Sequence, residues 1–137
     1  MGSGRLNLLL DTHIWLWSHL EPKRLSRRVE RALTKAGNEL WLSPISIWEF
    51  FLLVEHGHLR IHAGRTPTAW VAEALAARPM RDAAMSREVA VEAASVRLGH
   101  GDAADHLVVA TARVYDLTLV TADDRLHRTG WRFLANT

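Results

Sequence analysis

The segment LLLDTHIWLW, residues 8–17, decides how the chain begins to fold, because its apolar run stops at a carboxylate and then resumes. The run before Asp11 is typical of a buried strand, and a helix is expected to open near Thr12. A buried carboxylate without a partner is costly to desolvate. Asp11 therefore needs a backbone amide, a cation or a metal ion, and the segment predicts a charged site where strand and helix meet.

Length and composition predict one globular domain over residues 1–137. The chain has 137 residues, of which 48% are hydrophobic, enough to bury a core. It has no cysteine, which excludes disulfides and thiolate metal sites and fits a cytoplasmic protein. We expect residues 1–4 to be disordered or a cloning remnant. The apolar stretches are shorter than the roughly 20 residues that span a bilayer, so no membrane segment is expected.

The charge pattern favours phosphate-containing partners only weakly. The formal net charge is +2, and the 17 basic residues are nearly all arginine. The sequence pI is about 9.7. A guanidinium pairs well with phosphate, but an arginine preference fits a genome-composition effect equally well.

Hydrophobic periodicity and capping residues predict strands that alternate with helices. Strands are expected at residues 6–10, 39–43, 117–122 and 131–134, with a weak one within 80–86. Helices are expected at residues 12–19, 26–35, 44–56, 66–78, 86–99 and 102–116, with a short turn or helix at 123–130. This alternation predicts an α/β fold, a three-layer α/β/α sandwich with a central, mostly parallel sheet.

Two acids follow predicted strands directly. Asp11 comes after residues 6–10, and Asp123 comes after residues 117–122. Ligands of parallel sheets bind beyond the carboxyl ends of the strands, so both acids are expected at the same edge. Either Asp123 or Asp124 could merely cap the short helix, and nearness to the strand end favours Asp123 for the site.

Glu49 lies inside an apolar stripe of the helix expected at residues 44–56. Its neighbours on that stripe are Ile45, Trp48 and Leu52, so we expect Glu49 to face inward. The alternative is a structural acid paired with a buried arginine.

Asp105 repeats this pattern in the next acidic helix. It shares the spacing of a buried face with Val108, Val109 and Ala112. Asp102 lies one turn earlier and is a further candidate metal ligand, although an Asp that opens a helix is often only its N-cap.

Four carboxylates from separate segments are thus expected at one sheet edge: Asp11, Glu49, Asp105 and Asp123. Like charges this close raise each other's pKa unless a cation intervenes. Oxygen-only clusters suit Mg²⁺ or Mn²⁺, as one or two ions. The chemistry that follows is metal-assisted attack of water on a phosphodiester, with these four acids as catalytic residues.

Other polar residues and motifs add less. Thr12 is expected to place a hydroxyl at the site. Ser43, Ser46 and Thr121 could each contribute a further hydroxyl there or could equally be ordinary helix caps. The chain has no Walker A motif, dinucleotide glycine pattern or nucleophile elbow, and position 13 lacks the second aspartate of a haloacid-dehalogenase-type phosphatase. The histidines nearest the acids are interpreted as substrate contacts or surface residues: His13, His100 and His106.

Four motifs together resemble the PIN-domain ribonucleases, particularly the toxin halves of VapBC toxin–antitoxin pairs. In order, they are LLLDTHIWLW (8–17), LSPISIWEF (42–50), HGDAADHLVVATA (100–112) and LTLVTADDRL (117–126). The resemblance covers essentially the whole chain. It implies a Rossmann-like sheet and a Mg²⁺- or Mn²⁺-dependent endoribonuclease, and it carries the acidic roles over to the same four carboxylates.

The resemblance also implies partners. Such toxins cut RNA, commonly form homodimers and are blocked by a small cognate antitoxin that inserts into a groove. The helix at residues 44–56 fits a partner role because it is apolar on more than one face, or it is simply buried within the domain. This sequence departs from relatives that have an Asp-Pro-x-Asp-Arg motif, because Ala103 replaces the proline and His106 replaces the arginine. The departure affects the expected contacts with substrate more than the expected metal binding.

Two other functions remain open at this point. A non-catalytic RNA-binding or protein-interaction module could keep the fold, but the presence of all four acids argues against it. A DNA nuclease or a housekeeping RNA-processing enzyme could use the same scaffold. A short upstream reading frame for a DNA-binding antitoxin would favour the toxin over these.

Overall fold

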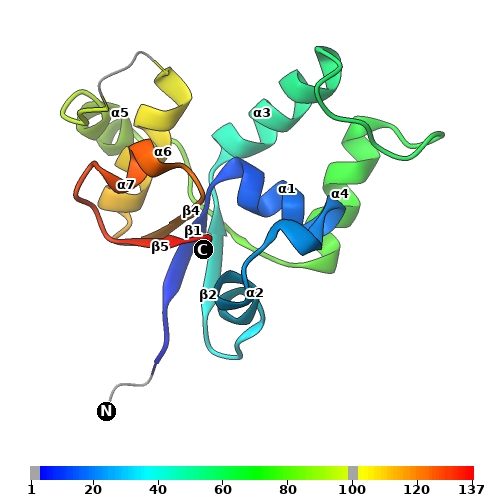
Figure 1. The fold of residues 1–137 in the computed structure, drawn as a ribbon. Helices are drawn as coiled ribbons and strands as arrows, with labels where there is room; N and C mark the ends of the chain where they lie inside the picture. The colour runs from blue at the N-terminus through cyan, green and yellow to red at the C-terminus, as the bar shows by residue number, and fades with distance from the viewer. Residues whose placement is uncertain (1–3, 99–101) are drawn as a thin grey trace.

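The central sheet has five strands, all parallel, in the order β3-β2-β1-β4-β5. A computed structural model describes residues 4–98 and 102–137 (Figure 1). The expectation for residues 1–3 lies outside this part of the chain. The strands are β1 (Asn7–Leu10), β2 (Glu39–Leu42), β3 (Arg81–Asp82), β4 (Thr118–Thr121) and β5 (Phe133–Ala135). The predicted α/β architecture is confirmed.

The helices begin where capping residues satisfy their first amides. They are α1 (Thr12–Leu20), the 3₁₀ turn η1 (Pro22–Arg24), α2 (Arg27–Thr34), α3 (Pro44–Glu55), α4 (Pro67–Ala77), α5 (Arg87–Ala93), α6 (Ala103–Val114) and α7 (Asp124–His127). Ser26 accepts a hydrogen bond from the Val29 amide, and Thr66 accepts one from the Ala69 amide. Thr66 is therefore the N-cap of α4.

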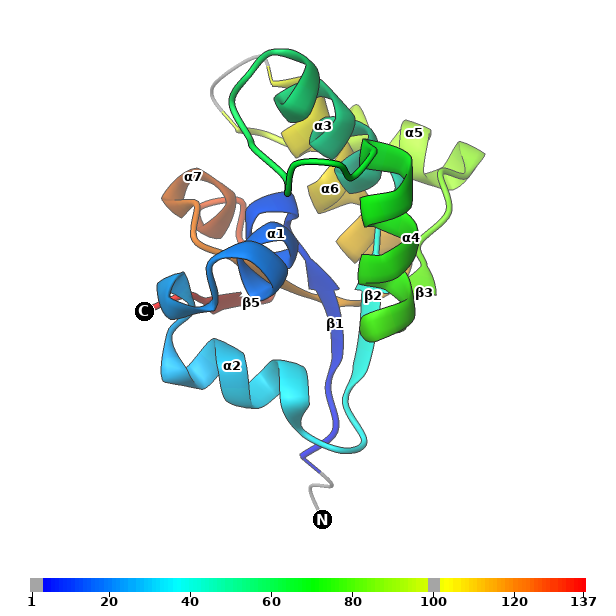
Figure 2. The same cartoon turned by 90° about the vertical axis from the view of Figure 1, so that its right-hand side faces the viewer.

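Alternating side chains of β1 enter two separate cores. Leu8 and Leu10 pack with residues of α1, α2, α3 and α4, whereas Leu9 packs with residues of α5 and α6. The ribbon shows these two helical groups on opposite sides of the strands (Figures 1 and 2). The three-layer α/β/α sandwich is confirmed, and burial on both faces explains why β1 is a continuous apolar run.

The strand order places a crevice at the carboxyl end of β1. The chain goes from β1 to β2 on one side and later to β4 on the other, so the order reverses between β1 and β4. The Asp11 amide donates to the Val120 carbonyl at 2.9 Å, which holds the two strand ends together. Ligands of open α/β sheets bind at such a reversal point.

The helix predicted at residues 86–99 is wrong in its second half, because α5 ends at Ala93. The Ser95 hydroxyl donates to the Glu92 carbonyl at 2.8 Å and so competes with a continuing helix. Val96 then turns into the core, where it is 2% exposed. Gly99, the predicted end, lies outside the described residues.

The apolar surface of α3 is mostly covered inside the domain. Phe50 is fully buried, and Phe51, Leu53 and Val54 pack against the same core. Burial within the domain, rather than a partner protein, therefore explains why these positions of α3 are apolar. Across residues 4–98 and 102–137, no helix has the length and apolarity needed to cross a membrane.

Candidate active site

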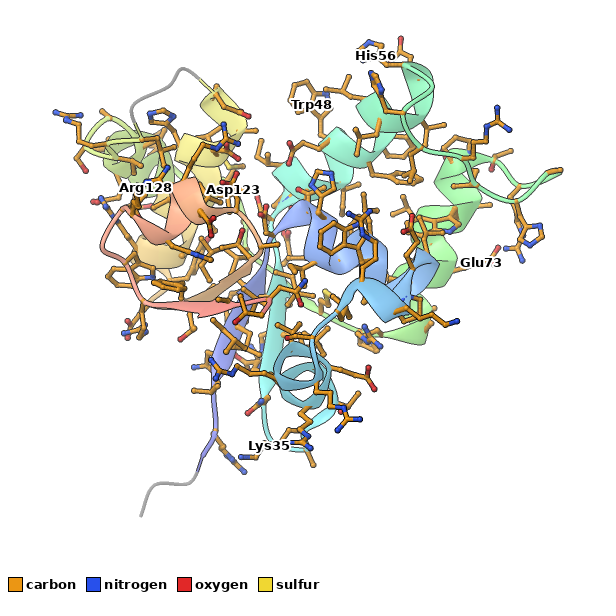
Figure 3. The ribbon with its side chains drawn as sticks, viewed as in Figure 1. Lys35, Trp48, His56, Glu73, Asp123 and Arg128 are labelled. Carbon is orange, nitrogen blue, oxygen red and sulfur yellow. The ribbon has the colours of Figure 1, made fainter. Side chains whose placement is uncertain are left out.

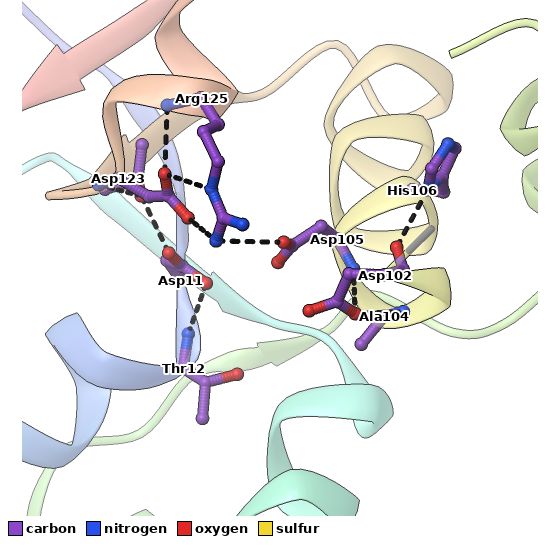
Figure 4. Close-up of polar contacts among 9 residues, drawn as sticks. Asp11, Thr12, Asp102, Ala104, Asp105, His106, Asp123 and Arg125 are labelled. Carbon is purple, nitrogen blue, oxygen red and sulfur yellow. Dashed lines mark hydrogen bonds and ion pairs between the residues drawn. The ribbon is translucent and has the colours of Figure 1, made fainter. Parts of the chain in front are cut away.

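A cleft of about 430 Å³ opens at the carboxyl edge of β1 and β4. Figure 4 shows most of its polar side chains, which come from elements far apart in the sequence. The structure brings all five predicted acids to this cleft: Asp11, Glu49, Asp102, Asp105 and Asp123. In the described part of the chain, however, no three acidic or imidazole side chains are close enough together to hold a metal ion as they stand.

Asp11 is held where β1 ends and α1 begins. One carboxylate oxygen accepts a hydrogen bond from the Thr12 amide at 2.8 Å, and the other accepts one from the Thr121 hydroxyl at 2.7 Å. Burial raises the pKa of Asp11, while these two hydrogen bonds lower it. The amide and the hydroxyl are thus the partners that a buried carboxylate at this position requires.

Thr121 ties two acids together. Its buried hydroxyl donates to Asp11 and accepts from the Asp123 amide at 3.0 Å. Ser43, in contrast, accepts from the Ile45 amide at 3.1 Å and is an ordinary helix cap. Of these two hydroxyls, only that of Thr121, the last residue of β4, contacts acids of the cleft.

Glu49 faces the cleft, as predicted, but the stripe used to predict it is wrong. Trp48 is 55% exposed and projects away from the domain (Figure 3), whereas Ser46 and Phe50 are buried. Residue 48 lies about 200° around a helix from residue 46, so both cannot face the core. Glu49 lies about 60° from Ser46 on the same count and reaches the cleft from the edge of the buried face.

The Thr12 hydroxyl links Glu49 to the core. Its oxygen lies 2.5 Å from Glu49 Oε1 and 2.8 Å from Ser46 Oγ. A hydroxyl has one proton to donate, so Thr12 donates to the carboxylate while Ser46 donates to Thr12. Burial raises the pKa of Glu49, and the hydrogen bond from Thr12 lowers it.

Asp102 and Asp105 come from the first turn of α6. Asp102 caps this helix, since its carboxylate accepts from the Ala104 amide at 3.0 Å and from the Asp105 amide at 3.3 Å. The side chain of Asp105 is only 14% exposed. Burial, and then the nearby Asp102 and Asp11 carboxylates, raise the pKa of Asp105 to about 7.

Arg125 is a cation of this cleft that pairs with two of its acids, and the sequence interpretation missed it. Its guanidinium donates to both oxygens of Asp123, at 3.1 Å and 2.7 Å, and its Nη2 lies 3.7 Å from Asp105 Oδ2 (Figure 4). The pKa of Arg125 is raised chiefly by its hydrogen bonds to Asp123. The only sequence signal for Arg125 was its place two residues after a capping aspartate. In the structure the Asp123 carboxylate also accepts a hydrogen bond from the Arg125 amide at 2.9 Å.

The choice of Asp123 over Asp124 agrees with the geometry. Asp123 lines the cleft, whereas the Asp124 side chain is 85% exposed and lies 3.5 Å from His127. Of the histidines considered, His13 lines the cleft, and the His106 ring nitrogen Nδ1 lies 2.8 Å from the Asp102 carbonyl. His100 lies outside the described residues.

The donor set fits a hard divalent cation in its chemistry. All five acidic side chains offer oxygen ligands, and burial together with the neighbouring carboxylates raises the pKa of Asp105. The Arg125 guanidinium now stands between Asp105 and Asp123. A metal ion at these carboxylates would therefore compete with this guanidinium.

Replacing Arg125 with Gln is expected to tighten Mn²⁺ binding by roughly two- to fivefold, because the positive charge that competes with the metal for Asp105 and Asp123 is lost. The effect is modest because the Arg125 side chain is partly exposed to solvent. Isothermal titration with Mn²⁺ measures the effect directly. Arg132→Gln is the matched control, since Arg132 pairs with Asp116 at 2.6 Å and does not line the cleft. Unchanged or weaker binding in Arg125→Gln would contradict the competition.

Known proteins share both the sequence pattern and the fold. Residues 8–132 match the family described as the PIN domain. The chain is 34% identical to Ribonuclease VapC22 of Mycobacterium tuberculosis over 120 aligned residues. The aligned region covers 87% of this chain and 88% of that protein.

Solved structures have the same fold, among them a toxin–antitoxin complex from Klebsiella pneumoniae, which matches with a TM-score of 0.68 at 15% identity over 96% of this chain and 98% of that one. VapBC2 from Rickettsia felis, bound to a DNA fragment from its promoter, matches with a TM-score of 0.72 at 18% identity, over 95% of this chain and 98% of that one. FitAcB from Neisseria gonorrhoeae matches with a TM-score of 0.64 at 23% identity, over 94% and 97% of the two chains. The resemblance stated from the four motifs is thereby confirmed, and the chain belongs to the PIN-domain family.

Proposed function

We propose that this chain is a divalent-metal-dependent endoribonuclease and the toxin of a type II toxin–antitoxin pair. The observation that carries the proposal is the cleft at the carboxyl edge of β1 and β4, where acids from four separate segments lie together. Its similarity to a protein named Ribonuclease VapC22, and to toxin–antitoxin structures, supports the substrate class and the biological role.

The acids would hold one or two Mg²⁺ or Mn²⁺ ions. When bound, such ions would polarise the phosphodiester and lower the pKa of a bound water molecule, so that the water would lose a proton more readily for attack. The ligands we propose are Asp11, Glu49, Asp105 and Asp123, with Asp102 as a further candidate. Asp105 is suited to this role, because burial and the neighbouring carboxylates raise the pKa of its carboxyl, and a bound cation would favour its charged form.

The surrounding hydroxyls would keep these ligands in place. Thr12 donates to Glu49, and Thr121 donates to Asp11, so each of these acids has one oxygen directed by a buried side chain. Hydrogen bonds of this kind orient metal ligands and limit their motion. Arg125, once its carboxylates are neutralised by a cation, is free to contact an RNA phosphate at the same cleft.

The partners we propose are RNA as substrate, a small cognate antitoxin and a second copy of this chain in a homodimer. The antitoxin follows from the complexes in which the structural neighbours were solved. The homodimer follows from the family resemblance alone.

The cleavage test uses purified chain shown to be free of antitoxin. We expect it to cut a pool of structured RNA with Mn²⁺ or Mg²⁺ present and to lose that activity in EDTA. Single-stranded and duplex DNA serve as competing substrates. No RNA cleavage with either metal would contradict the proposal, and preferential DNA cleavage would assign the site to a DNA nuclease.

A further inference from the structure

A second, more enclosed cavity of about 150 Å³ adjoins the acidic cleft. Both hollows are lined by His13, Trp17 and Arg24. A single strand whose phosphodiester lies in the cleft could therefore place its next nucleotide in this cavity, without crossing any intervening surface. We call this hollow the Trp17 pocket.

Trp17 carries a cation on its ring. The Arg24 guanidinium carbon lies 4.1 Å from the centre of the indole, and the His13 ring lies 5.8 Å from it at an angle of 53°. An aromatic face beside a cation is the combination by which proteins hold single-stranded nucleic acid, because bases stack on the ring and phosphates pair with the cation.

The walls of the Trp17 pocket suit a flat ring with polar edges. Its apolar part comes from four leucines: Leu16, Leu20, Leu53 and Leu59. Glu21 and His58 add a hydrogen-bond acceptor and an imidazole to the lining. A nucleobase has apolar faces and a polar edge of the same kind.

The charges on either side of Trp17 also favour RNA. The acidic cleft repels a phosphate backbone until a cation neutralises it, so RNA needs a positive contact elsewhere. Arg24 supplies one: its side chain is 55% exposed, and Glu21 lies no nearer than 3.6 Å to its guanidinium in their ion pair. This cation stands at the boundary between the two hollows.

We propose that the Trp17 pocket binds one unpaired base of the RNA, next to the phosphodiester held in the acidic cleft. Arg24, which lies over the Trp17 ring at 4.1 Å in the free protein, turns to the adjoining phosphate, and the base stacks on the ring face that it leaves. The inference rests on the proposed ribonuclease function and adds to it a substrate requirement, an unpaired nucleotide beside the cleavage site.

The test measures binding with Ca²⁺ in place of Mg²⁺ or Mn²⁺, because a cation has to neutralise the acidic cleft before RNA can lie in it. Ca²⁺ polarises bound water only weakly, so the measurement does not depend on cleavage. The probes are a fluorescein-labelled pool of short single-stranded RNA and an abasic ribose-phosphate strand of the same length, followed by anisotropy. Trp17→Ala is expected to weaken binding of the RNA pool about tenfold and to leave binding of the abasic strand unchanged. Trp48→Ala is the matched control, because Trp48 is exposed on α3 and lines neither hollow.

Two further variants keep the test decisive if Trp17→Ala does not fold. Trp17→Phe keeps an aromatic ring and is expected to retain most of the binding. Arg24→Gln changes an exposed side chain and is expected to weaken binding of both strands while lowering the salt dependence by about one phosphate contact.

Equal losses on the base-containing and abasic strands would overturn the proposal. Wild-type RNA binding in Trp17→Ala would do so as well and would leave the pocket to a protein partner. These outcomes differ from a failure of the proposed function, which would appear as absent cleavage by the wild-type chain with metal.

Discussion

Asp11→Asn is expected to lower metal-dependent RNA cleavage by about 100-fold or more, because it removes a negative charge from the centre of the proposed metal site. Asn has nearly the same shape as Asp and can still accept a hydrogen bond from the Thr12 amide. The chain should therefore remain folded. The measurement is the initial rate of RNA cleavage at saturating Mn²⁺, with thermal unfolding as the check on the fold.

Asp116→Asn is the matched control for this variant. Asp116 precedes β4 at the amino end of the sheet, opposite the cleft, and its side chain is 78% exposed. Its φ of 56° is one that Asn tolerates well, so the backbone should not change. Cleavage should remain near the wild-type rate, and full activity in Asp11→Asn would contradict our assignment of the site.

The acids of the site that follow strands can be located from the sequence alone. Parallel strands end at a common edge, so an acid directly after an apolar strand has to lie there. Asp11 and Asp123 meet this condition, and both line the cleft. Asp105 follows from its place among buried valines of α6, where a carboxylate would be costly without a function or a partner.

Glu49 shows where helix periodicity reaches its limit. The predicted stripe included Trp48, which is 55% exposed, yet the conclusion that Glu49 faces inward holds. Nearly every position of α3 is apolar, so the sequence cannot distinguish the core-facing side from the others. Packing against α1 and α4 decides the orientation.

The cations and the second hollow depend on contacts between distant segments. Arg125 and Arg24 lie in stretches with several arginines, and only the place of Arg125 two residues after Asp123 sets either of them apart. Their roles appear only when the fold brings Arg125 to Asp105 and Arg24 to Trp17. The sequence signals a carboxylate site because burying charge is costly, but a surface arginine carries no such cost.

The metal-free protein is expected to lose stability as the pH rises from about 4 to about 7, because of Asp105. The pKa of its carboxyl is about 7 in the folded chain, against an ordinary value of 3.8. Between these pH values the folded chain keeps a proton that the unfolded chain releases, so raising the pH favours unfolding. We expect a contribution on the order of 2 kcal/mol, measured by urea unfolding in EDTA at pH 5 and pH 8.

Asp105→Asn should remove the Asp105 part of this pH dependence and stabilise the metal-free chain at pH 8, where the wild type carries the full cost of the charge. A smaller slope of the same sign should remain, because the pKa values of Asp11 and Glu49 are raised as well. Asp116→Asn, whose side chain is 78% exposed, should retain the wild-type slope. Adding Mn²⁺ should stabilise the wild type more at pH 8 than at pH 5, since metal and protons compete for the same carboxylates. An equal loss of stability with pH in Asp105→Asn would show that the titrating charge lies elsewhere, and the burial of Asp105 would then no longer support a metal site.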